Sequence, residues 1–114
     1  NPSSNLPINL KCEHLVNIDS RSWRPNQAAL DQKLIKKHLF LRKFKKGDYF
    51  YPAGMKGKKL LSKFFKDEKY SLLEKEQQWL LCSDDQIVWV VGKRCDRRYI
   101  MNDNTETILL IYVI

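Results

Sequence analysis

The fold is decided by residues 79–92, which read WLLCSDDQIVWVVG. Two apolar runs, 79–82 and 86–91, flank a short polar turn at 83–85, and Gly92 ends the second run. Apolar runs of this length joined by a few polar residues are typical of a β-hairpin. We therefore expect two neighbouring antiparallel strands in this part of the chain.

Two short segments before the hairpin favour helices. From Lys58 onward the apolar side chains recur with the period of a helix. They are Leu60, Leu61, Phe64 and Phe65, and the lysines expected on the opposite face are Lys59, Lys63 and Lys66. A second helix is predicted over residues 71–77, because Ser71 and Glu74 have the spacing of a capping box.

Strands account for most of the remaining apolar sequence. The predicted segments are residues 6–16, 28–31, 38–44 and 107–114, and the last should be buried on both faces. Trp23, in a loop, is expected to pack on the core. Strands with one or two short helices indicate a β-rich α+β domain. We divide the chain into an N-terminal linker and first strand at residues 1–27, which pack on the domain, and the domain itself at residues 28–114.

The positive charge is concentrated in one third of the chain. The 114 residues, 43% of them hydrophobic, suit one packed domain, and 21 Lys and Arg against 13 Asp and Glu give a net charge of +8. Residues 32–70 hold thirteen Lys or Arg and three acids, a net +10, which leaves the other residues at −2. Such asymmetry predicts an anionic partner.

Clustered cations interleaved with aromatic and glycine residues are typical of RNA binding, because lysine and arginine neutralise phosphates. A second small cluster occupies residues 93–98. The predicted RNA-binding residues are Arg42, Lys43, Lys45, Lys46, Lys56, Lys58, Lys59, Lys63, Lys66, Arg94, Arg97 and Arg98. The alternative is a solvated basic face without a ligand, and Arg42 could equally pair with Asp48 inside the fold.

Two neighbouring features also leave alternatives open. The glycine-containing loop at residues 53–57 either brings backbone amides to a phosphate at the start of the helix or simply connects a strand to it. Four aromatic residues lie near this loop: Phe40, Phe44, Phe50 and Tyr51. We expect most of them to pack in the core and one or two to be exposed as platforms on which bases stack.

Catalytic and metal chemistry are not expected in this chain. His14 and His38 lie in no nucleophile motif, and Cys12 with His14 lacks the second close pair that would complete a zinc site. No phosphate-binding loop motif occurs, so we expect no cofactor. The odd cysteine count favours a reducing compartment, and neither a signal peptide nor a membrane-spanning run is predicted, so we expect a cytoplasmic protein.

The order of several short motifs resembles the C-terminal domain of bacterial tRNA(Ile)-lysidine synthase across residues 28–114. The matching residues are Leu41-Arg42, Gly47-Asp48, Phe50, Pro52, Gly54-Met55, Gly57, Lys59, the run 61–65, the run 87–92, Arg94-Cys95-Asp96 and Arg98-Tyr99. Lys63 stands where the family usually has Asp, and Trp79 where Pro is common. The resemblance implies a layered β-sandwich-like fold, similar to a module of the phenylalanyl-tRNA synthetase β subunit.

The resemblance also implies a role. The parent enzyme would use ATP, Mg and lysine in an N-terminal domain to ligate lysine to the wobble cytidine of the isoleucine tRNA with a CAU anticodon. This chain, which lacks the Ser-Gly-Gly-x-Asp-Ser loop of that domain, would be its non-catalytic tRNA-binding domain. The implied partners are tRNA near the acceptor stem, the parent's catalytic domain, and a second copy in a homodimer formed through the parent.

Two rival functions follow from other features of the chain. A packing or dimerisation domain without direct RNA contact would use the apolar strand at residues 108–114 or an exposed aromatic patch. Peripheral membrane binding would use the basic helix, but its short apolar face is needed for the core.

Overall fold

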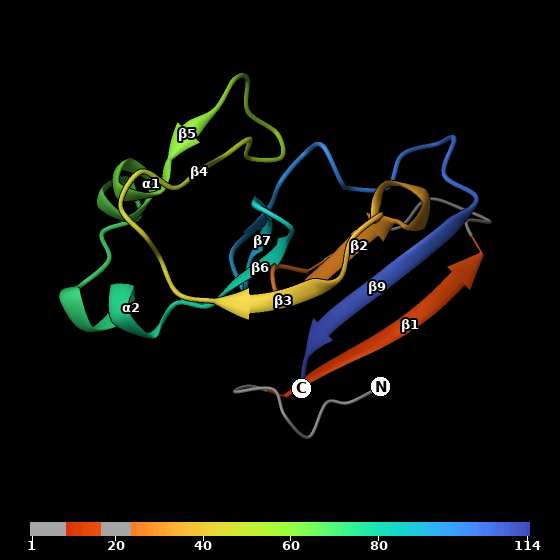
Figure 1. The fold of residues 1–114 in the computed structure, drawn as a ribbon, viewed down its shortest axis with the longest axis horizontal. Coiled ribbons are helices and arrows are strands. Elements are labelled where there is room, and N and C mark those ends of the chain that lie inside the picture. Colours follow the sequence, from red (N-terminus) through yellow and green to blue (C-terminus); the bar gives the residue numbers. More distant parts are fainter. Residues whose placement is uncertain (1–8, 17–23) are drawn as a thin grey trace.

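Three antiparallel sheets build the domain in the computed structural model, which describes residues 9–16 and 24–114 (Figure 1). The strands are β1 (Leu10–Val16), β2 (Gln27–Asp31), β3 (Leu39–Arg42), β4 (Tyr49–Phe50), β5 (Lys59–Leu60), β6 (Leu80–Ser83), β7 (Gln86–Val90), β8 (Arg94–Cys95) and β9 (Thr107–Val113). The helices are a 3-10 turn at Gln32–Leu34, α1 (Leu61–Asp67) and α2 (Leu72–Gln77). The sheets have the orders β1-β9-β2, β3-β6-β7-β8 and β4-β5.

The predicted hairpin is confirmed and forms the centre of the second sheet. β6 and β7 pair antiparallel, but the register shifts between Leu81 and Cys82. Leu81 lies opposite Trp89 and Cys82 opposite Ile87, so Val88 has no partner on β6 and forms a β-bulge. Because of this extra residue, Val88 and Trp89 both contribute to the same core cluster.

The second sheet is the middle layer of the domain. On one side it packs against the β1-β9-β2 sheet through a buried cluster that includes Leu30, Trp89 and Leu109. On the other side α1 and β4 cover it through a second cluster that includes Phe50 and Leu61. The β-rich, layered arrangement expected from the sequence is therefore confirmed.

The last strand, β9, lies between β1 and β2 and pairs with both (Figure 1). Residues 108–111 are buried, as the uninterrupted apolar run predicts. Both edges of β9 are paired and its centre is buried, whereas Tyr112 and Val113 are half-buried and Ile114 is exposed. A packing or dimerisation surface at residues 108–114 therefore stays a prediction.

Helix α1 begins at Leu61 and not at Lys58. Lys59 and Leu60 are taken up by strand β5, where they pair with Phe50 and Tyr49. Leu61 is fully buried while Leu60 is half exposed, so Leu60 is not part of the apolar face of the helix. The prediction of a helical face that includes Lys59 is wrong, because local pairing with β4 overrides the helical pattern of the sequence.

The second helix and the remaining strands agree with the sequence. Ser71 Oγ accepts a hydrogen bond from the Glu74 amide, and Glu74 Oε1 accepts one from the Ser71 amide, so the capping box is confirmed. The predicted strands at 28–31, 38–44 and 107–114 form with bounds that differ by a few residues. Residues 6–8 of the first predicted strand and Trp23 lie outside the described residues.

The four aromatic residues near the basic segment divide between core and surface. Phe50 is buried, and Phe44 packs edge-on against Phe65 of α1. Phe40 is exposed, and Tyr51 is half-buried. The core is therefore the right assignment for the first two only.

The first helical residue of each α-helix provides a matched test of the core. Leu61→Ala in α1 should lower the free energy of unfolding by about 2–5 kcal/mol, because it removes buried methyl groups and leaves a cavity. Leu72→Ala in α2 makes the same chemical change at a side chain that is 70% exposed, and should change stability by no more than about 0.5 kcal/mol. Urea unfolding of both variants measures the difference, and similar losses would contradict the assigned core.

Candidate nucleic-acid interface

The two basic segments of the sequence meet in the fold. The loop after β4 runs alongside β8 and the residues that follow it. Ala53 N donates to Cys95 O at 2.9 Å, and Arg97 N donates to Tyr51 O at 2.7 Å. Arg94 Nη1 donates to Ala53 O at 2.9 Å. These bonds join residues 51–53 to residues 94–97, which are about forty positions apart in the chain.

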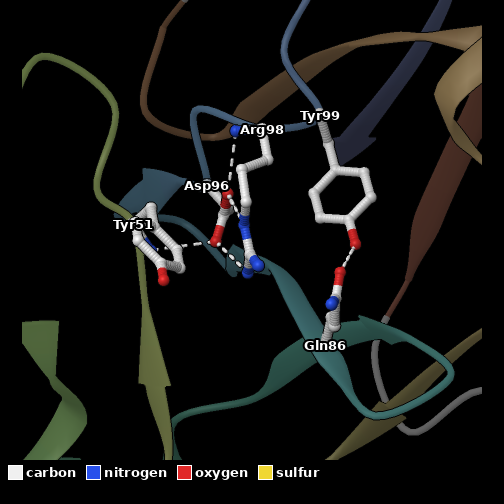
Figure 2. A network of polar contacts seen from close by, with 5 residues as sticks. All are labelled: Tyr51, Gln86, Asp96, Arg98 and Tyr99. Atoms are coloured by element: carbon white, nitrogen blue, oxygen red, sulfur yellow. Dashed lines mark hydrogen bonds and ion pairs between the residues drawn. The ribbon is translucent and has the colours of Figure 1, made fainter. Parts of the chain in front are cut away.

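A buried carboxylate holds this junction together (Figure 2). Asp96 is fully buried, and its Oδ2 accepts hydrogen bonds from the Tyr51 amide at 2.9 Å and from Arg98 Nη2 at 2.9 Å. Its Oδ1 accepts bonds from Arg98 N at 2.8 Å and Arg98 Nε at 3.0 Å. The side-chain hydrogen bonds from Arg98 to Asp96 raise the pKa of Arg98.

The Tyr51 ring lies next to two guanidinium groups. The Cζ atoms of Arg97 and Arg98 are 5.1 Å and 4.3 Å from the ring centroid, within the range of cation–π attraction. Tyr49 meets Tyr51 edge-on at 6.1 Å, and Lys58 Nζ lies 4.6 Å from the Tyr49 centroid. The surface therefore alternates aromatic rings with cations, a combination suited to phosphates and bases together.

We name this surface the basic junction, defined by Tyr49, Tyr51, Lys56, Lys58, Arg94 and Arg97. The four cations in it are exposed, and Tyr49 is 43% exposed. None of the four makes an ion pair within the described part of the chain. Their charge is therefore available to an anion.

Three other predicted residues are neutralised inside the fold. Arg98 pairs with Asp96, Arg42 pairs with Asp48, and Lys59 Nζ lies 2.7 Å from Asp67 Oδ2. Each of these three cations is at most 29% exposed at its side chain. They stabilise the protein and have little charge left for a phosphate.

The Arg42–Asp48 pair resolves one of the alternatives left open by the sequence. Arg42 Nη1 and Nη2 donate to the two carboxylate oxygens of Asp48 at 2.8 Å and 3.0 Å, and Lys45 N donates to Asp48 Oδ2 at 2.7 Å. Burial by itself would raise the pKa of Asp48, but these hydrogen bonds outweigh it and lower the pKa. Arg42 thus closes the turn between β3 and β4.

The remaining predicted residues lie on other elements, directly after β3, in the turn before β4 and on helix α1. Lys43 Nζ donates to Glu76 O of α2 and lies 3.9 Å from the Trp79 ring centroid. Lys45 and Lys46 are exposed in the turn before β4. Lys63 and Lys66 are exposed on α1, with Lys63 Nζ at 3.8 Å from Asp67 Oδ1. The twelve predicted cations thus come from several different elements and differ in whether they have an acidic partner.

The glycine-containing loop does not run directly into helix α1. Strand β5 stands between them, and the Leu61 amide at the start of α1 donates to Asp48 O at 2.8 Å. Of the two interpretations of this loop, the structure supports the connection and not a phosphate site at the helix start.

Sequence reasoning missed the part played by Asp96 and Tyr99. Asp96 is the single acid within residues 93–98, and a lone acid among cations could have indicated an internal pair. Tyr99 donates a hydrogen bond from its hydroxyl to Gln86 Oε1, which joins the segment after Asp96 to the turn of the central hairpin (Figure 2). Burial raises the pKa of Tyr99, so the hydroxyl keeps its proton.

Neither a metal site nor a reactive thiol stands out in the described residues. They contain no group of three or more His, Cys, Asp or Glu side chains that could hold a metal ion. Cys82 is buried, and burial raises the pKa of Cys95 to about 12, so both are neutral thiols. Among the helices of residues 9–16 and 24–114, none has the length and apolar character to span a bilayer.

Arg97 and Arg98 are neighbours with opposite expected effects on stability. Arg98→Ala would leave Asp96 buried and unpaired, and should cost roughly 3–5 kcal/mol. Arg97→Ala removes only an exposed cation beside Tyr51, and should cost under about 1 kcal/mol. Thermal or urea unfolding distinguishes the two, and equal losses would show that Asp96 does not depend on Arg98.

The stability supplied by Asp48 should depend on pH. Its pKa is lower in the folded protein than the ordinary 3.8, so its contribution is present above pH 3.8 and is lost as the pH falls through the folded pKa. Asp48→Asn should cost roughly 1–3 kcal/mol at pH 7, and its difference from the unsubstituted protein should shrink below pH 3.8. Urea unfolding between pH 7 and 2.5 measures this, with Asp85→Asn in the exposed hairpin turn as control. A difference that does not change with pH would contradict the ion pair.

Comparisons with known proteins agree with this architecture. The family model described as the TilS substrate C-terminal domain matches residues 39–112. A tRNA(Ile)-lysidine synthase of Parabacteroides distasonis is 46% identical over 107 residues, which are 92% of this chain and 24% of that protein. The corresponding enzyme of Bacteroides thetaiotaomicron is 34% identical over 113 residues, 97% of this chain and 26% of that protein. The chain thus spans about a quarter of the length of these curated relatives.

A solved structure shows the same fold. The crystal structure of a TILS C-terminal domain superposes with a TM-score of 0.80, covering 94% of this chain and 86% of the other at 20% identity. The family match includes β3 to β8, the basic junction and most of β9. Since the matched residues are well over half of the sequence, this chain belongs to the family of TilS substrate C-terminal domains.

Proposed function

We propose that this chain is the non-catalytic tRNA-binding domain of a tRNA(Ile)-lysidine synthase. The parent enzyme would use ATP, Mg and lysine in its catalytic domain to ligate lysine to the wobble cytidine of the isoleucine tRNA with a CAU anticodon. Residues 28–114 would form the domain and residues 1–27 its linker and first strand. The cytoplasm, where tRNA is modified, would be its location, with the catalytic domain as a neighbour and a homodimer formed through the parent.

One observation carries the proposal. The basic junction brings together cations from two segments that are far apart in sequence, and it keeps Lys56, Lys58, Arg94 and Arg97 exposed. Exposed cations neutralise phosphates and release counterions, which supplies affinity without reading sequence. Such a surface suits a domain that grips a tRNA, with the acceptor stem as the proposed region, while another domain performs the chemistry.

The other exposed lysines would act at longer range. Lys43, Lys45, Lys46, Lys63 and Lys66 add positive potential around the junction, which speeds the approach of an anionic partner. Arg42, Lys59 and Arg98 would support the surface from inside the fold through their ion pairs.

A second candidate function rests on helix α2. Leu72 and Leu73 are 70% and 60% exposed, and two adjacent exposed leucines favour a protein contact. Such a contact would pack this domain against the remainder of the parent chain, and it is compatible with RNA binding elsewhere. Membrane binding through α1 is not supported, because Leu61, Phe64 and Phe65 are buried in the core.

Two matched triple substitutions test the RNA surface. Changing Lys56, Lys58 and Arg97 to Glu should weaken binding of the isoleucine tRNA at least tenfold at low salt. It should also flatten the dependence of log K on log salt, by roughly one unit for each phosphate that is no longer neutralised. Changing Lys11, Lys36 and Lys75 to Glu alters the net charge by the same amount at other exposed positions.

Gel shifts of the 114-residue chain at several salt concentrations measure both effects. If the two triple variants bind alike, general charge and not the basic junction holds the RNA. Unchanged circular dichroism spectra and unfolding midpoints would show that both variants remain folded.

A further inference from the structure

A hollow opens beside the basic junction, where the first sheet meets the edge of the second. It has a volume of about 340 Å³ and is lined by residues of β2, β7 and β8 and by the segment after Tyr99. Its apolar lining includes Ala29, Trp89, Ile100 and Met101. The volume is at the small end of the range for ligand pockets, which suits one small planar group and not a helix or a duplex.

Trp89 forms part of the wall of the hollow, but not as a polar group. Trp89 is fully buried, and its Nε1 is itself enclosed, with no hydrogen-bond partner among the described residues. A group bound in the hollow would therefore contact the indole as an apolar surface.

Two arginines flank the hollow. Arg24 and Arg94 line it and are exposed. Lys93 also lines it, but its Nζ lies 5.6 Å from the centroid of the Tyr70 ring, which is not part of the hollow. Arg24 is held by a tight turn, since its amide donates to Gln27 Oε1 at 3.0 Å and its carbonyl accepts from Gln27 N at 2.9 Å. Within residues 9–16 and 24–114, no acidic side chain lines the hollow to offset the two arginines.

We infer that this hollow binds a single unpaired nucleotide of an RNA, with its base on the apolar lining and its phosphate at Arg24 and Arg94. A base offers a flat apolar face, which matches the apolar lining, and its phosphate matches the two arginines. A purely apolar ligand would leave the cations unused, and a paired base would not fit the volume. The inference rests on the proposed function, because it assigns an RNA feature to the same face of the domain.

The adjacency of the hollow and the basic junction gives the binding mode. Arg94 belongs to both, and Ala53, which accepts the hydrogen bond from Arg94, lines the hollow. A paired segment of RNA lying on the junction would therefore place an unpaired neighbour next to the mouth. The junction would hold the backbone, and the hollow would select RNAs that have an unpaired nucleotide at that point.

The test compares two RNAs that differ in one nucleotide. One is a short hairpin with a single unpaired nucleotide in its stem, and the other is the same hairpin fully paired. The 114-residue chain should bind the first at least tenfold more tightly. Arg24→Ala should remove most of this preference and leave the fully paired hairpin within a few-fold of its original affinity. Lys11→Ala, at an exposed position elsewhere, is the matched control.

The indole N–H resonance of Trp89 provides a direct readout. The chain has three tryptophans, and loss of one indole signal in Trp89→Phe assigns it. Should that variant fail to fold, through-bond assignment of the unsubstituted protein serves instead. The signal should shift with the hairpin that has an unpaired nucleotide, and with millimolar nucleoside monophosphates, but not with the fully paired hairpin.

The outcomes separate this inference from the proposed function. If both hairpins bind equally and the Trp89 signal does not move, the hollow is not a nucleotide site, although RNA binding by the domain stands. If neither hairpin binds and the isoleucine tRNA also fails to bind, the proposed function is wrong and the inference falls with it.

Discussion

The buried carboxylate of Asp96 is the constraint on which the functional face depends. A carboxylate without solvent contact needs hydrogen-bond donors, and here the loop after β4 and the segment after β8 supply them. The Asp96 amide in turn donates to the carbonyl of Val88, the bulged residue of the central hairpin. One side chain therefore ties the middle sheet to two loops that have little regular structure of their own. The exposed cations keep their positions because those loops are held in this way.

Ion pairing within the fold divides the basic residues into two groups. Arg42, Lys59 and Arg98 form ion pairs with acids within the fold, whereas the cations of the basic junction remain exposed. Sequence charge alone treats all of them alike. The net charge of the chain thus overstates the charge that a ligand would meet at any one place.

Much of the fold follows from the sequence, and the exceptions have physical reasons. The hairpin, the capping box of α2 and the buried centre of β9 each follow from a local sequence pattern, and the structure contains all three. Helix α1 starts late because Lys59 and Leu60 pair with β4, an interaction between segments that the helical pattern does not contain. The candidate site was only partly predictable for a similar reason. Its cations were identified, but their grouping depends on hydrogen bonds between residues 51–53 and 94–98, which no local pattern encodes.

The position of β9 has a consequence for how the domain is made. The central strand of the first sheet is the last to leave the ribosome, so β1 and β2 have no partner in that sheet until almost the whole domain has been synthesised. The middle sheet and α1 can assemble earlier from contacts that lie closer in sequence, and the first sheet can close only over a layer that already exists. Until then, the apolar face of the middle sheet stays uncovered, and this interval is when a nascent chain would be most exposed to aggregation or to chaperones.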